Sequence, residues 1–476
     1  MSELKFPVSG KTRLEHDLLG DKQVPEEALF GVQTLRCIEN FNISNCHLCD
    51  YPEFIKAFGI VKKGAILANH KLGLVSDEIK DAIVQACDEL IAGQHIEHFP
   101  IDMMQGGAGT SANMNANEVI ANRALEIMGH KHGEYTYCHP NDHVNMAQST
   151  NDAYPVAMHF GVYMMHQDAI QALDRLIAAF NAKKEEYAKV IKMGRTQLQD
   201  AVPMTLGQTF GAFAHAMEHE KAKLERASKE FLVINMGATA IGTGITAEPD
   251  YAGYCTEYLK TISGWDVTMA EDFIEATHDT SCFTGYSAAL KSIAIRLSKI
   301  CNDLRLMGSG PRTGLAEINL PPKQPGSSIM PGKVNPVIPE VVNQVCFKVI
   351  GNDFTIGMAS EAAQLELNVM EPVMVQSIVE STKWLTRAFD TLRIECIEGI
   401  TANVEHCKDM VENSIGIVTA LKPYIGYSKC SAVAKEALAT GGSVYKLVLE
   451  KGYLTKEQLD KIMDPRHMTQ PSKVEL

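Results

Sequence analysis

The stretch LKSIAIRLSKICNDLRLM, residues 290–307, decides the fold because its apolar residues recur at intervals of three and four. This spacing places them on one stripe of an α-helix. They are Leu290, Ile293, Leu297, Ile300, Leu304 and Met307. The same interval recurs in residues 210–231 and 378–396, and residues 162–191 contain neither proline nor glycine. We therefore expect several helices of about 25 residues, roughly twice the usual length.

Apolar stripes of this length must be covered along their whole extent, so the sequence predicts a bundle of long helices. A stripe that the chain itself leaves uncovered needs another subunit, and we expect a homo-oligomer. Three domains are expected. They are a mixed, mainly helical domain at 1–144, a central long-helix bundle at 145–400 and a small helical domain at 401–476.

Composition fits a globular protein of 476 residues, with 45% apolar and 21% charged residues. The net charge is −14, from 44 basic and 58 acidic residues without basic clusters, so no nucleic-acid or membrane-surface partner is expected. No apolar run reaches the roughly 18 residues of a membrane span, and the first residues do not resemble a secretory signal. The 12 scattered cysteines are typical of reduced thiols, and we expect a cytoplasmic protein.

The most informative break between the long helices is GSSIMPGKVNP, residues 326–336. Its glycines and prolines prevent a continuous helix, and loops on rigid scaffolds often carry functional residues. Lys333 offers a cation for a carboxylate, and Asn335 offers amide donors. Taken alone, the segment is equally compatible with a flexible linker that carries a solvated lysine.

Three further breaks carry polar candidates. Thr110 follows a Gly-rich stretch, in which the backbone can approach a ligand closely. Ser149, Thr150 and Asn151 precede a helix, whose N-terminus favours an anion, although simple helix capping explains them equally well. A third break, at 192–208, contains two candidates, and an ordinary loop is its alternative interpretation. These two are Thr196 and Gln197.

Metal-binding patterns are weak, and no metal ligand is predicted. Cys46 and Cys49 form one CxxC without a second pair, and His215 and His219 do not belong to an HExxH motif. His95 and His98 lack a carboxylate companion in the sequence. Structural roles are expected for all of these residues. Walker A, GxGxxG and GxSxG patterns are missing from the sequence, which disfavours nucleotide binding and α/β-hydrolase chemistry.

Five segments taken together resemble the conserved blocks of the fumarase/aspartase superfamily, in the same order along the chain. They are GGAGTSANMNANE, QSTNDAYP, GRTQLQDAVPMT, GATAIGTG and, most specifically, GSSIMPGKVNP. The resemblance covers residues 13–465. It implies an all-α subunit of three domains and a homotetramer, with active sites that each combine residues of three subunits. It also implies no required cofactor, with a divalent cation such as Mg²⁺ as an activator.

The resemblance also assigns roles position by position. Ser327 corresponds to the base that removes the Cβ proton of the substrate. The substrate-binding positions are Thr110, Ser149, Thr150, Asn151, Thr196, Gln197, Ser328, Lys333 and Asn335. Loss of the proton beside a carboxylate leaves an aci-carboxylate with two negative charges, which hydroxyl, amide and lysine donors stabilise. A serine needs activation for this task, and we expect closure of the loop to bring Ser327 near Lys333 and to exclude water.

The implied reaction is the reversible loss of ammonia from L-aspartate to give fumarate. Fumarases of the superfamily carry histidine where this chain has Gln197. Hydroxide leaves with acid–base help, whereas an ammonium group is already protonated, so Gln197 favours release of ammonia. Two alternatives stay open at this stage: a fumarate hydratase acting on L-malate and a non-catalytic helical scaffold.

Overall fold

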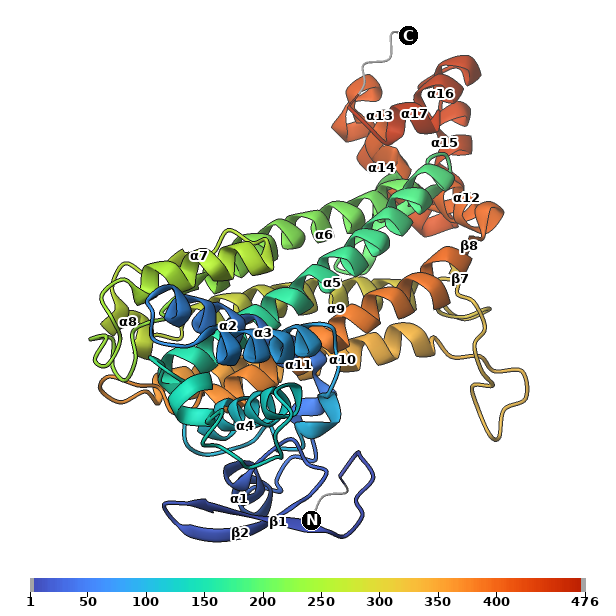
Figure 1. Cartoon of the computed structure of the whole chain (residues 1–476). Coiled ribbons are helices and arrows are strands. Elements are labelled where there is room, and N and C mark those ends of the chain that lie inside the picture. The colour runs from blue at the N-terminus through green and yellow to red at the C-terminus, as the bar shows by residue number, and fades with distance from the viewer. Residues whose placement is uncertain (1–3, 472–476) are drawn as a thin grey trace. The chain divides into compact units, whose positions relative to one another are not determined.

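The computed structural model describes residues 4–471 and is dominated by long helices (Figure 1). The longest are α5 Thr150–Glu186, α6 Leu206–Ser228, α9 Ser281–Met307, α10 Val337–Glu361 and α11 Glu371–Glu395. Every member of the stripe predicted in α9 is buried, from Leu290 to Met307. The prediction of an all-α fold with unusually long helices is confirmed.

The chain divides into two compact units. Unit 1 contains the residues up to Ile170 together with Ala222–Ser292 and Lys348–Trp384. Unit 2 contains Gln171–Lys221, Ile293–Phe347 and the residues from Leu385 onward. The division into domains at 1–144, 145–400 and 401–476 stays a prediction.

Unit 1 is built around α2, which packs against α3 and α7, while α3 packs against α4. Most of α2 is therefore buried, including the side chain of Lys62. The helices of this unit, besides the long ones, are α1 Val32–Asn40, α2 Pro52–Lys71, α3 Asp77–Ile91, α4 Thr110–Ile127, α7 Tyr251–Ser263 and α8 Phe273–His278. Its strands form an antiparallel hairpin, β1 Thr12–Asp17 with β2 Gly20–Pro25, and a short parallel pair, β5 Val233–Ile234 with β6 Thr268–Met269.

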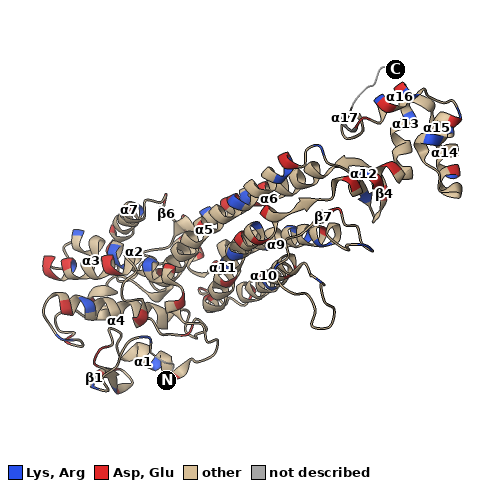
Figure 2. Ribbon diagram, turned by 90° about the vertical axis from the view of Figure 1, so that its right-hand side faces the viewer, with Lys and Arg blue, Asp and Glu red and all other residues tan. Residues whose placement is uncertain are grey.

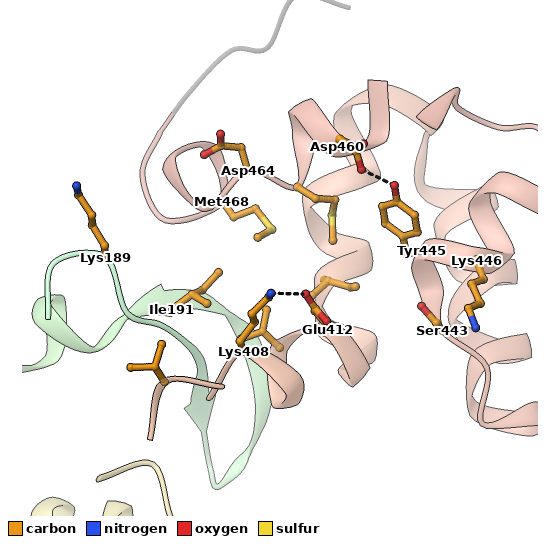
Figure 3. A pocket seen from close by; sticks show the side chains of 14 residues that line it. Lys189, Ile191, Lys408, Glu412, Ser443, Tyr445, Lys446, Asp460, Asp464 and Met468 are labelled. Atoms are coloured by element: carbon orange, nitrogen blue, oxygen red, sulfur yellow. Dashed lines mark hydrogen bonds and ion pairs between the residues drawn. The ribbon is translucent and has the colours of Figure 1, made fainter. Parts of the chain in front are cut away.

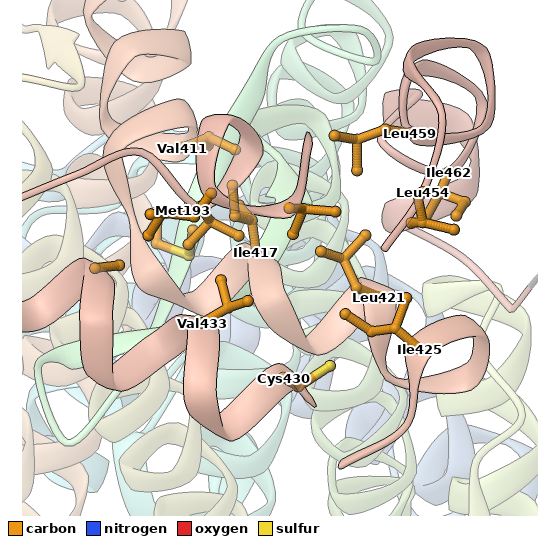
Figure 4. Close-up of a cluster of buried hydrophobic side chains, with 14 residues drawn as sticks. Met193, Val411, Ile417, Leu421, Ile425, Cys430, Val433, Leu454, Leu459 and Ile462 are labelled. Atoms are coloured by element: carbon orange, nitrogen blue, oxygen red, sulfur yellow. The ribbon is translucent and has the colours of Figure 1, made fainter. Parts of the chain in front are cut away.

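Unit 2 contains an antiparallel hairpin, β3 Ile191–Thr196 with β4 Gln199–Thr205, and a short pair, β7 Ile318–Asn319 with β8 Thr401–Ala402. Its further helices are α12 Val404–Asn413, α13 Val418–Ile425, α14 Tyr427–Thr440, α15 Val444–Glu450, α16 Lys456–Ile462 and α17 Pro465–Met468. Buried apolar residues bring these short helices and β3 together, and Figure 4 shows Met193, Ile417, Leu421 and Val433 facing one another.

The chain around residue 190 differs from the sequence-based expectation. The uninterrupted helical pattern extends to Ile191, but α5 ends at Glu186 and Ile191 already belongs to β3. The break at 192–208 is an ordered hairpin rather than an irregular loop, because its strands pair from Ile191 with Thr205 to Thr196 with Gln199. Backbone pairing with a neighbouring strand overrides the local helical pattern here.

Charges of both signs are intermixed along the helices (Figure 2). Within residues 4–471, none of the helices is both long enough and apolar enough to span a membrane.

Candidate functional site

The start of α4 is held by an unusual backbone. Gly107, Ala108 and Gly109 all have positive φ angles, of 91°, 54° and 86°. A Cβ atom on Gly109 would lie 2.4 Å from the ring of Tyr154 on α5, so glycine is required for α4 and α5 to approach each other. Thr110 is exposed directly after this turn, and its hydroxyl donates to the carbonyl oxygen of Gly107 over 2.8 Å.

The polar run at 149–151 begins α5. The backbone N–H of Asn151 donates to Ser149 Oγ over 3.1 Å, and the N–H of Ser149 donates to Asp152 Oδ1 over 2.9 Å. Ser149 therefore caps the start of α5 by accepting from the second helical residue, and the capping interpretation holds for Ser149. Thr150 Oγ1 accepts a hydrogen bond from Asn113 of α4 over 3.3 Å, and Asn151 Nδ2 donates to the carbonyl oxygen of Ala240.

Asp152 connects this helix start to the segment between β5 and α7. It is fully buried, and its Oδ2 accepts from the backbone N–H groups of Gly237 and Thr239 over 3.2 and 3.0 Å. Burial raises the pKa of its carboxyl group to about 6, against the lowering effect of these hydrogen bonds. Sequence reasoning missed this residue, although an acidic side chain three positions after Ser149 is the usual signal of a capping box.

Thr196 and Gln197 lie at the tip of the hairpin β3–β4. Gln197 and Leu198 form its two-residue turn, with positive φ angles of 53° and 63°, as in hairpin turns of type I′. Strand β3 is held along its length by the fully buried Glu317, which pairs with Arg195 over 2.6 Å and with Lys192 over 2.7 Å. The turn itself is exposed.

The loop at 326–336 is closed by contacts between its two ends. The N–H of Gly326 donates to the carbonyl oxygen of Lys333 over 2.7 Å, and Asn335 Nδ2 donates to the carbonyl oxygen of Gly326 over 2.7 Å. A Cβ atom on Gly326 would lie 2.5 Å from that oxygen of Lys333, so no other residue fits. The side chains of Ser328 and Lys333 are exposed.

Ser327 has a particular backbone environment within this loop. Its Oγ accepts hydrogen bonds from the backbone N–H groups of Ile329 and Met330, over 3.2 and 3.0 Å. Two donors aimed at one hydroxyl oxygen stabilise its anionic form. The role of Ser327 as a base stays a prediction, and this backbone environment is compatible with it.

The ten predicted site residues fall into two sets, one in each unit. Thr110, Ser149, Thr150 and Asn151 belong to unit 1, where α4 and α5 meet. The hairpin tip and the loop at 326–336, with the remaining six, belong to unit 2. A common site formed by both groups stays a prediction.

Unit 2 also contains a cavity of about 690 Å³ between β3 and the short C-terminal helices (Figure 3). Its wall combines apolar side chains, such as Ile191 and Met468, with Lys408, Glu412 and Tyr445. None of the ten predicted site residues lines it. Among residues 4–471, no three histidine, cysteine, aspartate or glutamate side chains gather as a metal ion would require.

Comparison with known proteins gives concordant results. Residues 20–351 match a family model described as a lyase, and residues 417–470 match the fumarase C C-terminus. Aspartate ammonia-lyase of Helicobacter pylori is 55% identical over 459 residues, which cover 96% of this chain and 98% of the relative. A solved structure titled fumarate lyase:delta crystallin, from Brucella melitensis and bound to cobalt, is 51% identical with a TM-score of 0.94, over 97% of this chain and 100% of that chain.

A recombinant class II fumarase from Schistosoma mansoni has the same fold, with a TM-score of 0.91, but is only 33% identical over 97% of this chain and 100% of that chain. The fold and these matches define the class of protein as a lyase. Within this class, the chain belongs to the aspartate ammonia-lyases of the fumarase/aspartase superfamily.

Proposed function

We propose that the protein is an enzyme that converts L-aspartate reversibly to fumarate and ammonia. The observation that carries the proposal is the environment of Ser327, whose hydroxyl oxygen accepts two backbone N–H groups in the GSSIMPGKVNP loop. The 55% identity to an aspartate ammonia-lyase over nearly the whole chain supports the same reaction. A non-catalytic scaffold is disfavoured, because it has no need for the combination of Ser327, Lys333 and Asn335.

In this proposal Ser327 acts as the base for the Cβ proton. The proton passes to Ser327 Oγ, and the electron pair of the C–H bond moves into the neighbouring carboxylate, which becomes the aci-carboxylate. Lys333 and Asn335, with Ser328, Thr196 and Gln197, then donate to the substrate carboxylates. Lys333 is exposed and can turn toward an anion when the loop closes over the substrate.

The amino group and the other carboxylate are assigned to unit 1. Thr110 and Thr150 stand in the first turns of α4 and α5, where free N–H groups and the helix dipole favour an anion. Ser149 and Asn151 complete this group. As the aci-carboxylate collapses, its extra electron pair forms the C=C bond and the C–N bond breaks. The substrate's ammonium group takes the electrons of that bond and leaves as neutral ammonia, so no acid is needed at Gln197.

Hydration of fumarate to L-malate is the alternative reaction. The lower identity of 33% to the class II fumarase, compared with 55% to the aspartate ammonia-lyase, does not favour it. Purified full-length protein is therefore tested with L-aspartate and L-malate separately, and fumarate is followed by its ultraviolet absorbance together with free ammonia. We expect fumarate and ammonia from L-aspartate only. Fumarate from L-malate alone would establish the hydratase, and no product from either would refute the enzyme proposal.

We also propose a homotetramer with active sites shared between subunits. The support is an apolar face on α10, where Phe347, Phe354 and Met358 are 62%, 73% and 56% exposed in the single chain. They are seven and four residues apart and so lie on one face of the helix. Exposed apolar stripes of this kind mark protein interfaces.

The proposal also includes the cofactor requirement of the enzyme and its location in the cell. The reaction as written needs no cofactor, and a divalent cation such as Mg²⁺ enters only as an activator. The residues described do not fit a resident magnesium site, since they bring no cluster of suitable ligands together. A chelator should accordingly leave basal turnover intact. We place the enzyme in the cytoplasm, with no nucleic-acid or membrane partner.

A further inference from the structure

Lys62 occupies an unusual position in the centre of unit 1. It is fully buried on α2, and its Nζ lies 2.7 Å from Asn113 Oδ1, 2.9 Å from Gln148 Oε1 and 3.1 Å from Asn145 Oδ1. The structure records no ion pair of Lys62 within residues 4–471. A buried lysine that binds three neutral amides stabilises the fold poorly compared with an apolar side chain, and its position calls for another explanation.

The lysine fixes the orientation of the Asn113 side chain. An ammonium group can only donate hydrogen bonds, so the amide of Asn113 must turn its oxygen toward Lys62. Its nitrogen then points the other way and donates to Thr150 Oγ1 over 3.3 Å and to Asn145 Oδ1 over 3.1 Å. Rotation of the amide would place two hydrogen-bond donors against each other at Lys62.

This orientation determines what Thr150 can do. Its hydroxyl oxygen accepts from Asn113, which leaves the hydroxyl hydrogen to be donated elsewhere. Thr150 is half-buried at the first turn of α5, where the helix dipole already favours an anion. We propose that Lys62 is a positioning residue that, through the Asn113 amide, holds Thr150 as a hydrogen-bond donor to the anionic substrate. The inference rests on the proposed function, in which Thr150 contacts L-aspartate.

The groups around Lys62 agree with this role. Three acceptor oxygens match the three hydrogens of an ammonium group, whereas a neutral amine would set its lone pair against one of them. Burial lowers the pKa of Lys62 to about 7, and the negative charge of Asp152 on α5 opposes that change. The nearby thiols of Cys87 on α3 and Cys255 on α7 stay protonated and uncharged at this pH, because burial raises the pKa of each. The charge is therefore retained near and below neutral pH.

A double-mutant cycle tests this relay, by which we mean the contacts from Lys62 through Asn113 to Thr150. Lys62→Met and Thr150→Val should each raise the KM for L-aspartate by about 10- to 100-fold, the cost of one hydrogen bond to a charged group, with a smaller change in kcat. The double variant should bind no worse than Thr150→Val alone, because both changes remove the same bond. Lys63→Met is the matched control on the same helix, since Lys63 pairs with Asp88, and its KM should stay within about twofold.

Additive effects in the cycle would overturn the inference, because a purely structural role of Lys62 acts independently of Thr150. If Lys62→Met does not melt cooperatively, Asn113→Asp decides the matter. The aspartate still accepts from Lys62 but cannot donate to Thr150, so the KM should rise in a folded protein, and an unchanged KM would refute the relay. No turnover by the wild-type enzyme would refute the proposed function and this inference with it, whereas turnover with additive effects would refute the relay alone.

Discussion

The hydroxyl of Ser327 depends on its own backbone turn for its chemistry. Two N–H groups, from Ile329 and Met330, donate to its oxygen, and in the proposed mechanism they would stabilise the alkoxide that takes the proton from carbon. Only proline would remove one of these backbone donors, and it would also change the shape of the loop. Removal of the Ser327 hydroxyl by alanine leaves the backbone donors in place, so it separates the role of the hydroxyl from the shape of the loop.

Ser327→Ala should lower kcat by about 10²- to 10⁴-fold, the usual contribution of a general base. Binding of fumarate, followed by calorimetric titration, should stay close to that of the unaltered enzyme. Ser328→Ala, in the same loop, should cost less, because Ser328 is assigned a binding contact and not the proton. Turnover by Ser327→Ala at a near-normal rate would remove Ser327 from the mechanism.

Glu371, the first residue of α11, gives a prediction about pH and stability. Burial raises the pKa of its carboxyl group from 4.5 to about 8. Between these values the folded state holds a proton that the unfolded chain has lost, so the free energy of unfolding falls as pH rises, by about 1.4 kcal/mol per pH unit. Below pH 4.5 both states are protonated and the effect vanishes.

Glu371→Gln removes this titration. As the pH is raised from 4.5 to 8, the melting temperature of the wild-type protein should therefore fall relative to that of the variant. Below pH 4.5 the difference between the two melting temperatures should stay constant. A difference that stays constant across the whole range would show that Glu371 is ionised in the folded protein.

At the scale of elements, the sequence predicted the long helices well and the hairpin poorly. The apolar stripe of α9 follows from spacing alone, because a regular helix turns by a constant angle per residue. The hairpin turn at Gln197 and Leu198 has positive φ angles without glycine or asparagine, so the usual turn signal is missing. Its geometry is imposed by tertiary contacts, in which Glu317 pairs with Lys192 and Arg195.

The close contact between the two ends of the 326–336 loop, at Gly326, gives a prediction for a single element. Gly326→Ala places a Cβ atom 2.5 Å from the carbonyl oxygen of Lys333, so the loop must widen and Ser327 must shift. A misplaced base of this kind should lower kcat/KM about 100-fold. Gly253→Ala, on α7 with open space around it, is the control and should leave activity unchanged. Equal activities of the two variants would show that the close contact between Gly326 and Lys333 has no functional role.

For the whole molecule, the sequence indicated candidate segments for a site, and that assignment stays a prediction, but it did not indicate the buried groups that hold these segments. Asp152 and Lys62 lie in regular helical patterns, where a single polar residue is usually exposed. Only the packing of α2, α4 and α5 reveals that both are buried, and that Lys62 contacts Asn113, which donates to Thr150. Such positions depend on contacts between distant segments, and local spacing contains no information about them.

The apolar face of α10 leads to a prediction about assembly. Phe354→Glu places a charge at the most exposed aromatic of this face, at a residue that is 73% exposed in the single chain. In a tetramer the charge would be buried without a partner, at a cost of several kcal/mol per ion, and the assembly should dissociate. Light scattering should then give a mass below four times 52.2 kDa, with loss of activity. An unchanged mass would exclude this face from the interface.

The central claim is that polar segments of different subunits together stabilise one aci-carboxylate, and subunit complementation tests it most directly. Ser327→Ala is mixed with a Thr110→Val/Thr150→Val variant, and the two proteins are dissociated and reassembled together. If a site takes its base from one subunit and its carboxylate donors from another, some mixed sites are intact, and we predict that L-aspartate deamination returns. Mixed assemblies that stay as inactive as their parents would contradict the account, because each chain would then hold a complete site of its own.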